Sequence, residues 1–224
     1  MVNKAIYKKL INDLGEKTTL VAVSKVRTED DIMDLYTLGH RDFGENYVQE
    51  LIEKQLVLPK DIQWHFIGHL QTNKVKFIIP FVHLIHTVDS FKLLLEINRQ
   101  AKKTDRVVDC LLQVHIAKEE TKYGLHEAEL EELMQGLNAA GKAHELENIR
   151  VAGLMGMASL TNDEFRVRVE FELLSSLYDK YASIRSANVH FTTLSMGMSD
   201  DYRIAIEEGS NMVRIGSLLF GKRP

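Results

Sequence analysis

The sequence predicts an α/β fold: a single (β/α)8 TIM-type barrel in which eight parallel strands alternate with helices. Three observations support this prediction. Short apolar runs alternate along the chain with segments of helical period. The length is 224 residues, and 224 divided by eight is 28, which suits one strand–helix unit. No Gly/Ser-rich linker interrupts the chain, so residues 1–224 are expected to form one domain.

Eight apolar runs are predicted to be strands. They are Thr19–Ser24, Arg41–Phe43, Gln63–Ile67, His83–Val88, Val107–Ile116, Ile149–Met155, Phe191–Ser195 and Met212–Ile215. Strands that alternate with helices imply a parallel sheet with right-handed crossovers. A closed barrel is the first prediction, and an open, doubly wound sheet is the alternative. In both folds the chemistry belongs at the carboxyl ends of the strands.

The segments between the strands carry apolar residues at the spacing i, i+3, i+4, i+7, which places them on one helix face. The clearest of these stripes begin at Ile32, Phe91, Leu130 and Tyr202. The stripe that begins at Phe91 is expected to bury Leu95. Helix starts are indicated by Thr28, three residues before Asp31 as in a capping box, and by Ser199.

Composition excludes several classes of protein. With 28 basic and 32 acidic residues the net charge is −4, which argues against a general nucleic-acid or membrane-surface binder. The one cysteine, Cys110, allows no internal disulfide, as is typical of a reducing compartment. The amphipathic N-terminal segment is neither a signal peptide nor a membrane anchor. We therefore expect a cytoplasmic protein that binds neither membranes nor nucleic acid.

Lys25 directly follows the first predicted strand. A lysine at the mouth of a barrel can act as a nucleophilic amine and form a Schiff base with an aldehyde cofactor. By its position alone, however, Lys25 is better explained as a solvated lysine in a loop.

The last two strands indicate a phosphate site. In a barrel such a site is built from the loops after strands seven and eight and a short helix N-terminus. Ser195 ends the seventh strand, and Gly216 and Ser217 follow the eighth. Arg214 alternates with Val213 and Ile215, so it is expected to face the barrel interior and to need a partner there. The alternative is a salt-bridged structural arginine beside turn glycines.

Three further residues follow predicted strands. Asn46 could contact a ligand, although capping of the next helix is the more typical role. Lys74 and Lys122 could add positive charge at the mouth of the barrel, or they could be surface lysines. The spacings of His65 with His69 and of His83 with His86 do not favour a metal pair. We also find no P-loop, GxGxxG or GxSxG motif.

Four segments resemble, in order, the motifs of the pyridoxal phosphate (PLP) homeostasis protein family. They are AVSK ending at Lys25, FGENYVQE, HFIGHLQTNK, and LSMGMSDDYRIAIEEGSNMVRIGSLLFG. This family comprises small, barrel-only relatives of alanine racemase among the fold-type III PLP proteins. The resemblance runs from about Val21 to Gly221, which is most of the chain.

The resemblance implies roles for individual residues. Lys25 would hold PLP as an internal aldimine, and Arg214 would face the pyridine nitrogen. Ser195, Gly216 and Ser217 match phosphate-binding positions. Asn46 matches a residue that lines the pocket. Lys122 matches a family lysine that looks like an exchange or secondary site.

The resemblance also implies a function in PLP homeostasis. An arginine opposite the ring nitrogen keeps it unprotonated, which weakens the ring as an electron sink. After Gly221 only three residues remain, too few for the second domain that supplies the catalytic tyrosine of the racemases. We therefore expect a monomeric carrier that buffers PLP and supplies PLP-dependent apo-enzymes, without robust turnover. The alternatives are a slow amino-acid racemase and a PLP-free phosphosugar enzyme.

Overall fold

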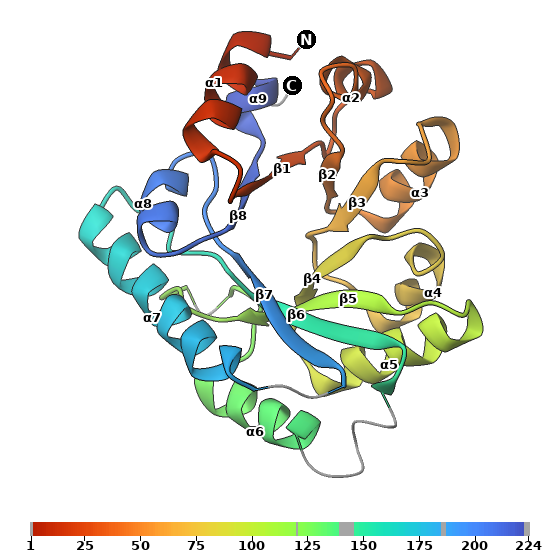
Figure 1. The fold of residues 1–224 in the computed structure, drawn as a ribbon, viewed down its shortest axis with the longest axis vertical. Helices are drawn as coiled ribbons and strands as arrows, with labels where there is room; N and C mark the ends of the chain where they lie inside the picture. Colours follow the sequence, from red (N-terminus) through yellow and green to blue (C-terminus); the bar gives the residue numbers. More distant parts are fainter. Residues whose placement is uncertain (1, 120, 139–145, 185–186, 222–224) are drawn as a thin grey trace.

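A computed structural model describes residues 2–119, 121–138, 146–184 and 187–221. Eight parallel strands close into a barrel in sequence order, so the barrel prediction is confirmed and the open sheet is wrong. Figure 1 shows the strands at the centre with the helices around them. The strands are β1 (Thr19–Val23), β2 (Asp42–Glu45), β3 (Gln63–Phe66), β4 (Leu84–Val88), β5 (Val108–Val114), β6 (Ile149–Gly156), β7 (Val189–Ser195) and β8 (Met212–Ile215).

The helices follow the strands in alternation. They are α1 (Lys4–Leu14), α2 (Glu29–Tyr36), α3 (Val48–Val57), α4 (Val75–Ile78), α5 (Phe91–Lys103), α6 (Glu127–Asn138), α7 (Glu164–Ala182), α8 (Tyr202–Glu207) and α9 (Ser217–Phe220), with a 3-10 turn at Thr72–Lys74 before α4. Among the residues that the structure describes, no helix has both the length and the apolar character to cross a membrane.

The predicted strands agree with the observed ones to within two residues at each end. The largest functional difference is in β2, which was predicted to end at Phe43 but continues to Glu45. Because side chains alternate along a strand, Phe43 and Glu45 face the same side. Phe43 packs in the layer between the barrel and its helices. Glu45 therefore points outward, toward α3, and this matters for the site.

The helix starts and faces were predicted in part. Thr28 caps α2 as expected, because its side chain accepts a hydrogen bond from Asp31 N. The prediction for Leu95 is wrong: it is 41% exposed, since α5 instead buries the neighbouring stripe that contains Leu93 and Ile97. The prediction that Ser199 starts a helix is also wrong, because Asp201 occupies the N-cap of α8.

Two apolar layers hold the barrel together. The larger lies between the strands and the surrounding helices. The smaller lies inside the barrel and contains Val21, Leu84, Leu111, Ala152, Met155 and Met212. Polar side chains share this interior, and they are described below. Buried polar groups need hydrogen-bond partners, so the interior has to be built as a connected network.

The barrel closes where β1 pairs with β8. Thr19 is opposite Met212, and Ala22 is opposite Ile215. The two strands run parallel and in register, so the residues that follow each of them emerge at the same edge. Closure thus places Lys25, from one end of the sequence, next to Gly216 and Ser217 from the other.

Candidate functional site

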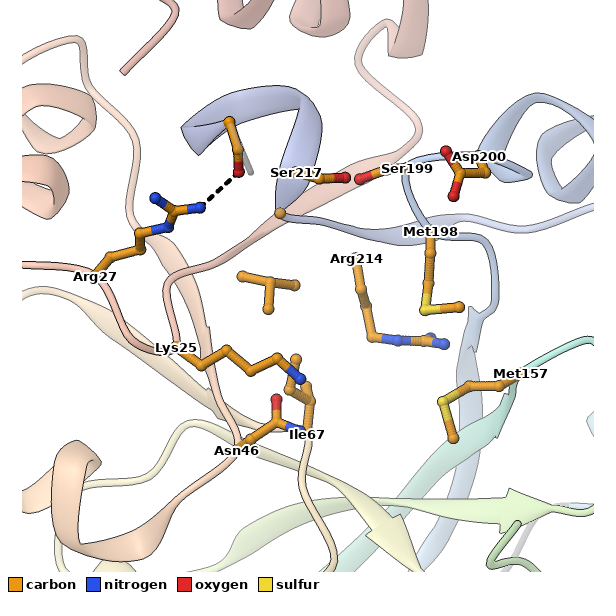
Figure 2. Close-up of a pocket in the computed structure, with 13 residues that line it drawn as sticks. Lys25, Arg27, Asn46, Ile67, Met157, Met198, Ser199, Asp200, Arg214 and Ser217 are labelled. Atoms are coloured by element: carbon orange, nitrogen blue, oxygen red, sulfur yellow. Dashed lines mark hydrogen bonds between the residues drawn. The ribbon is translucent and has the colours of Figure 1, made fainter. Parts of the chain in front are cut away.

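A pocket of about 460 Å³ opens at the carboxyl ends of the strands. This volume is in the range of small-molecule and cofactor sites. Residues after β1, β2 and β8 contribute much of its lining, including Lys25, Arg27, Asn46 and Ser217, and Arg214 lines it from β8 itself. Figure 2 shows the Lys25 side chain extending into this space. The pocket therefore brings together five of the six residues that the sequence predicts to bind PLP. These are Lys25, Asn46, Arg214, Gly216 and Ser217.

The backbone around Lys25 is fixed from both sides. Ser24 Oγ donates a hydrogen bond to Glu45 Oε1 at 2.6 Å. Val26 N donates to Glu50 Oε1 at 2.6 Å. Val26 also has a φ of +60°, which is unusual for a β-branched residue and persists only where the surroundings enforce it. These contacts set the direction in which Lys25 leaves β1.

A buried cation joins the two carboxylates behind Lys25. Lys54 Nζ, on α3, donates to Glu45 Oε1, Glu50 Oε1 and Ser24 O, each at 2.7 Å. The side chains of Lys54 and Glu45 are 4% and 0% exposed. Burial raises the pKa of Glu45, and Lys54 partly offsets this effect. We call Ser24, Glu45, Glu50 and Lys54 the Lys54 cluster; it couples the position of α3 to the exit of Lys25.

Arg214 faces the barrel interior, as predicted, and it also lines the pocket. Its Nη1 donates to Ser195 Oγ at 2.7 Å, and its Nη2 donates to Gly156 O at 2.9 Å. Burial lowers the pKa of Arg214 to about 10, and Asp201 partly opposes the change. The guanidinium therefore remains a cation at neutral pH.

Ser195 is fully buried, and its hydroxyl lies between Arg214 and His86 Nδ1, 3.2 Å away. It is not among the residues that line the pocket in the described part of the chain. Strand β7 ends with this hydroxyl inside the barrel, where it accepts a hydrogen bond from Arg214. The contact of Ser195 with a phosphate stays a prediction.

The wall formed after β7 and β8 carries two hydroxyls and a glycine that suit an anion, beside the carboxylate of Asp200. Ser199, Gly216 and Ser217 all line it. Figure 2 shows the hydroxyl groups of Ser199 and Ser217 on this wall. A Cβ on Gly216 would lie 3.3 Å from both Val23 Cβ and Val23 O, so a side chain there would crowd β1. Glycine thus allows the β8 backbone to approach the pocket closely.

Sequence reasoning missed Arg27, Ser199 and Asp200 as lining residues. Arg27 Nη2 donates to Gly221 O at 2.6 Å, which ties the loop after β1 to the end of α9. The sequence could have indicated Arg27, because it is two residues after Lys25 in the same loop. The sequence pattern of Ser199 indicates only a helix start and gives no sign that its hydroxyl lines the pocket.

Asn46 lines the pocket and does not cap α3, whose N-cap is Tyr47. Its side-chain Oδ1 is buried and has no hydrogen-bond partner among the residues described. A buried oxygen without a partner is costly, and a ligand in the pocket could supply one.

The two lysines that the sequence left open lie outside this pocket. Lys122 Nζ donates to Ala158 O at 2.7 Å and forms an ion pair with Glu119 at 3.2 Å, so it joins two loops of the barrel rim. Lys74 lines a separate groove beside Tyr47 and Phe77. Among the described residues, no group of three or more His, Cys, Asp or Glu side chains could hold a metal ion.

Known proteins resemble this chain over most of its length. The family model "Alanine racemase, N-terminal domain" matches residues 5–224. The pyridoxal phosphate homeostasis protein of Aquifex aeolicus is 42% identical over 205 residues, 91% of this chain and 86% of that protein. The human protein of the same name is 38% identical over 214 residues, 91% of this chain and 76% of that protein.

Solved structures agree as well. PipY of Synechococcus elongatus without PLP has a TM-score of 0.89 at 32% identity, covering 97% of this chain and 99% of that one. PipY with PLP bound has a TM-score of 0.86 over the same shares. An alanine racemase of Clostridium difficile, at 18% identity, matches in fold with a TM-score of 0.74 over 99% of this chain and 56% of that one. The chain therefore belongs to the pyridoxal phosphate homeostasis protein family, within the alanine racemase N-terminal domain family.

Proposed function

We propose that this protein binds PLP in the pocket through a Schiff base on Lys25 and acts in PLP homeostasis by buffering and supplying the cofactor. The observation that carries the proposal is the pocket itself. It combines an amine, two guanidinium groups, two hydroxyls, the Asp200 carboxylate and the oxygen of Asn46 that has no partner among the described residues. Relatives named for PLP homeostasis, and PipY with PLP bound, support the same cofactor.

Each group on the pocket wall suits one part of PLP. The hydroxyls of Ser199 and Ser217, the close backbone of Gly216, and the charge of Arg27 would hold the phosphate. Asn46 would contact a polar substituent of the ring. The neutral Lys25 amine would add to the aldehyde carbon, and water would leave as the carbon–nitrogen double bond forms.

Arg214 favours a carrier over a catalyst. PLP chemistry depends on the protonated pyridine ring, which acts as an electron sink. In the proposed binding mode the cationic guanidinium of Arg214 would lie beside the ring nitrogen and would keep it unprotonated. Among the lining residues that the structure describes there is also no Tyr, His or Cys to act as a second acid or base. We infer binding without robust turnover, and supply of PLP to apo-enzymes by a monomer in the cytoplasm.

A slow racemase-type activity is the second candidate, because the Asp200 carboxylate also lines the pocket. Exchange of substrate α-protons in deuterated water separates the two. Enzyme-like exchange that disappears in Asp200→Asn would favour the catalyst. The absence of exchange across the common amino acids would favour the carrier.

The proposed function is tested by the absorbance of the purified protein with added PLP. The wild type should show the yellow band of a lysine–PLP Schiff base, and borohydride should remove it. Lys25→Ala should abolish the band. Lys74→Ala is the matched control, because Lys74 lines the neighbouring groove and should leave the band intact. A colourless wild type that cannot be loaded with PLP would refute the proposal.

A further inference from the structure

A chain of hydrogen bonds runs through the barrel interior from Asp42 to Arg214. His65 Nε2 lies 3.0 Å from Asp42 Oδ1, and His65 Nδ1 lies 2.9 Å from His86 Nε2. His86 Nδ1 lies 3.2 Å from Ser195 Oγ, which accepts from Arg214 at 2.7 Å. We call these five residues the interior chain. It connects the start of β2, at the opposite end of the barrel, to the pocket.

One pattern of donors and acceptors joins the two ends of the interior chain. Arg214 can only donate, so Ser195 Oγ accepts from it, and the hydroxyl proton of Ser195 is available to His86 Nδ1. In the same pattern His86 donates from Nε2 to His65 Nδ1. His65 donates from Nε2 to Asp42, whose carboxylate can only accept. No link in this pattern has two donors or two acceptors.

Burial acts on both groups of the interior chain whose pKa is shifted from that of a free histidine or aspartate. Burial holds the pKa of His86 well below its usual value, and His65, Arg214 and His83 lower it further. Burial raises the pKa of Asp42, but the hydrogen bond from His65 and the nearby histidines outweigh it, so that pKa is lowered. The interior chain thus joins a buried cation, Arg214, to a carboxylate, Asp42.

The interior chain also limits what Arg214 can do at the pocket. One nitrogen is held by Ser195 and another by Gly156 O, so two edges of the planar guanidinium are fixed. The remaining N–H groups are then left for a ligand. His86 Nδ1 is the second partner of the Ser195 hydroxyl, so loss of this contact would leave the hydroxyl held by Arg214 alone and would weaken one of the two anchors of the guanidinium.

We propose that Asp42, His65 and His86 are positioning residues for Arg214, and that the carboxylate of Asp42 sets the direction of the hydrogen bonds that orient the guanidinium toward PLP. This inference rests on the proposed function for its ligand, and on geometry alone for the chain. Asp42 acts through the other residues and does not touch the pocket.

The first test needs no ligand. Nitrogen-15 NMR of the unliganded protein should show the ring nitrogens of His65 and His86 in the donor and acceptor pattern of the interior chain. In Asp42→Asn the amide can donate as well as accept, so the direction is no longer fixed. The ring signals of both histidines and the side-chain N–H signals of Arg214 should shift. Unchanged signals would overturn the proposal.

Asp109→Asn is a matched control. Asp109 is also at the start of a strand, is 23% exposed against 25% for Asp42, and pairs with Arg150 outside the interior chain. It should leave the signals of His65, His86 and Arg214 in place. Equal shifts in the two variants would show that any lost carboxylate at this end of the barrel has the same effect, and this would also overturn the proposal.

The second test measures PLP binding. Loss of a hydrogen bond to a charged group corresponds to roughly tenfold in affinity, so Asp42→Asn should weaken PLP binding by roughly three- to tenfold and change the band of the bound cofactor. Asp109→Asn should do neither. Normal affinity and an unchanged band in Asp42→Asn would refute the positioning role. If the wild type itself binds no PLP, the proposed function fails. The ligand-free NMR experiment still tests whether Asp42 controls the hydrogen bonds of the interior chain.

Discussion

Lys54→Met tests whether the Lys54 cluster is a buried ionic unit. The substitution keeps an unbranched apolar side chain but removes three hydrogen bonds of 2.7 Å from Nζ. Glu45, which is fully buried, would lose its cation. Breaking a buried pair by removing one partner costs about 3–5 kcal/mol, a large part of the roughly 5–15 kcal/mol that stabilises a typical domain. We expect a loss of this size in the free energy of unfolding, measured by urea denaturation at pH 7.

The pH dependence of this variant gives a second check. The pKa of Glu45 is already raised by burial, and without Lys54 the folded state should bind its proton more tightly than the unfolded state does. When the folded state binds more protons, stability rises as the pH falls. The deficit of Lys54→Met should therefore shrink between pH 7 and pH 5, and the double variant Glu45→Gln/Lys54→Met should recover part of it at pH 7.

Lys4→Met is the control for the Lys54 variant. Lys4 pairs with Asp34 at 3.0 Å, but the two side chains are 52% and 32% exposed. An exposed pair of this kind contributes at most about 1 kcal/mol. A loss in Lys54→Met no larger than that in Lys4→Met, or one that does not change with pH, would refute the account of the Lys54 cluster as a buried ionic unit.

Two further predictions concern acid stability and the strand register. Burial lowers the pKa of His40 and of His86 from 6.5, so the unfolded state takes up protons first as the pH falls. Stability should fall below about pH 6.5 by up to roughly 1.4 kcal/mol per pH unit for each of them, measured as the midpoint of urea unfolding; a flat profile from pH 7 to 5 would contradict this. Gly153→Ala should abolish folding as judged by circular dichroism, because a Cβ there would lie 1.8 Å from Thr193 O at a φ of +150°, whereas Gly136→Ala, with nothing within 4 Å, should be neutral or stabilising. A folded Gly153→Ala of normal stability would contradict the register of β6 and β7.

The sequence was sufficient for the barrel because each strand is a short apolar run and each intervening segment has a helical stripe. Strand alternation turned Arg214 toward the interior, and the family resemblance added Lys25 and Asn46 to the pocket, which their positions after parallel strands allow. The face of α5 was predicted in part: Leu94 of the predicted stripe is buried, but Leu95 is exposed, and packing buries Leu93 and Ile97 instead.

The interior chain could not be predicted in the same way. Strand alternation says that His65 faces inward, but it does not say which residue lies across the barrel. Register shifts between Ile85 and Val88 in β4, and near Gly153 in β6, change those distances. The histidines were examined only as metal ligands, so their mutual hydrogen bond was not considered. The Lys54 cluster was missed for a simpler reason: β2 was predicted to end before Glu45.

The closure of β1 on β8 has a consequence for folding kinetics. The pairing of Thr19 with Met212 spans nearly the whole chain, so it carries the largest loop-closure entropy and belongs late in folding. Lys25 and Ser217 come together only in that step. A small molecule that contacts both residues binds the closed barrel and not a barrel in which β1 and β8 are apart. At a concentration a hundredfold above its dissociation constant, it would stabilise the closed barrel by about 2.7 kcal/mol. The protein would then release its cofactor most readily when the pairing of β1 with β8 opens.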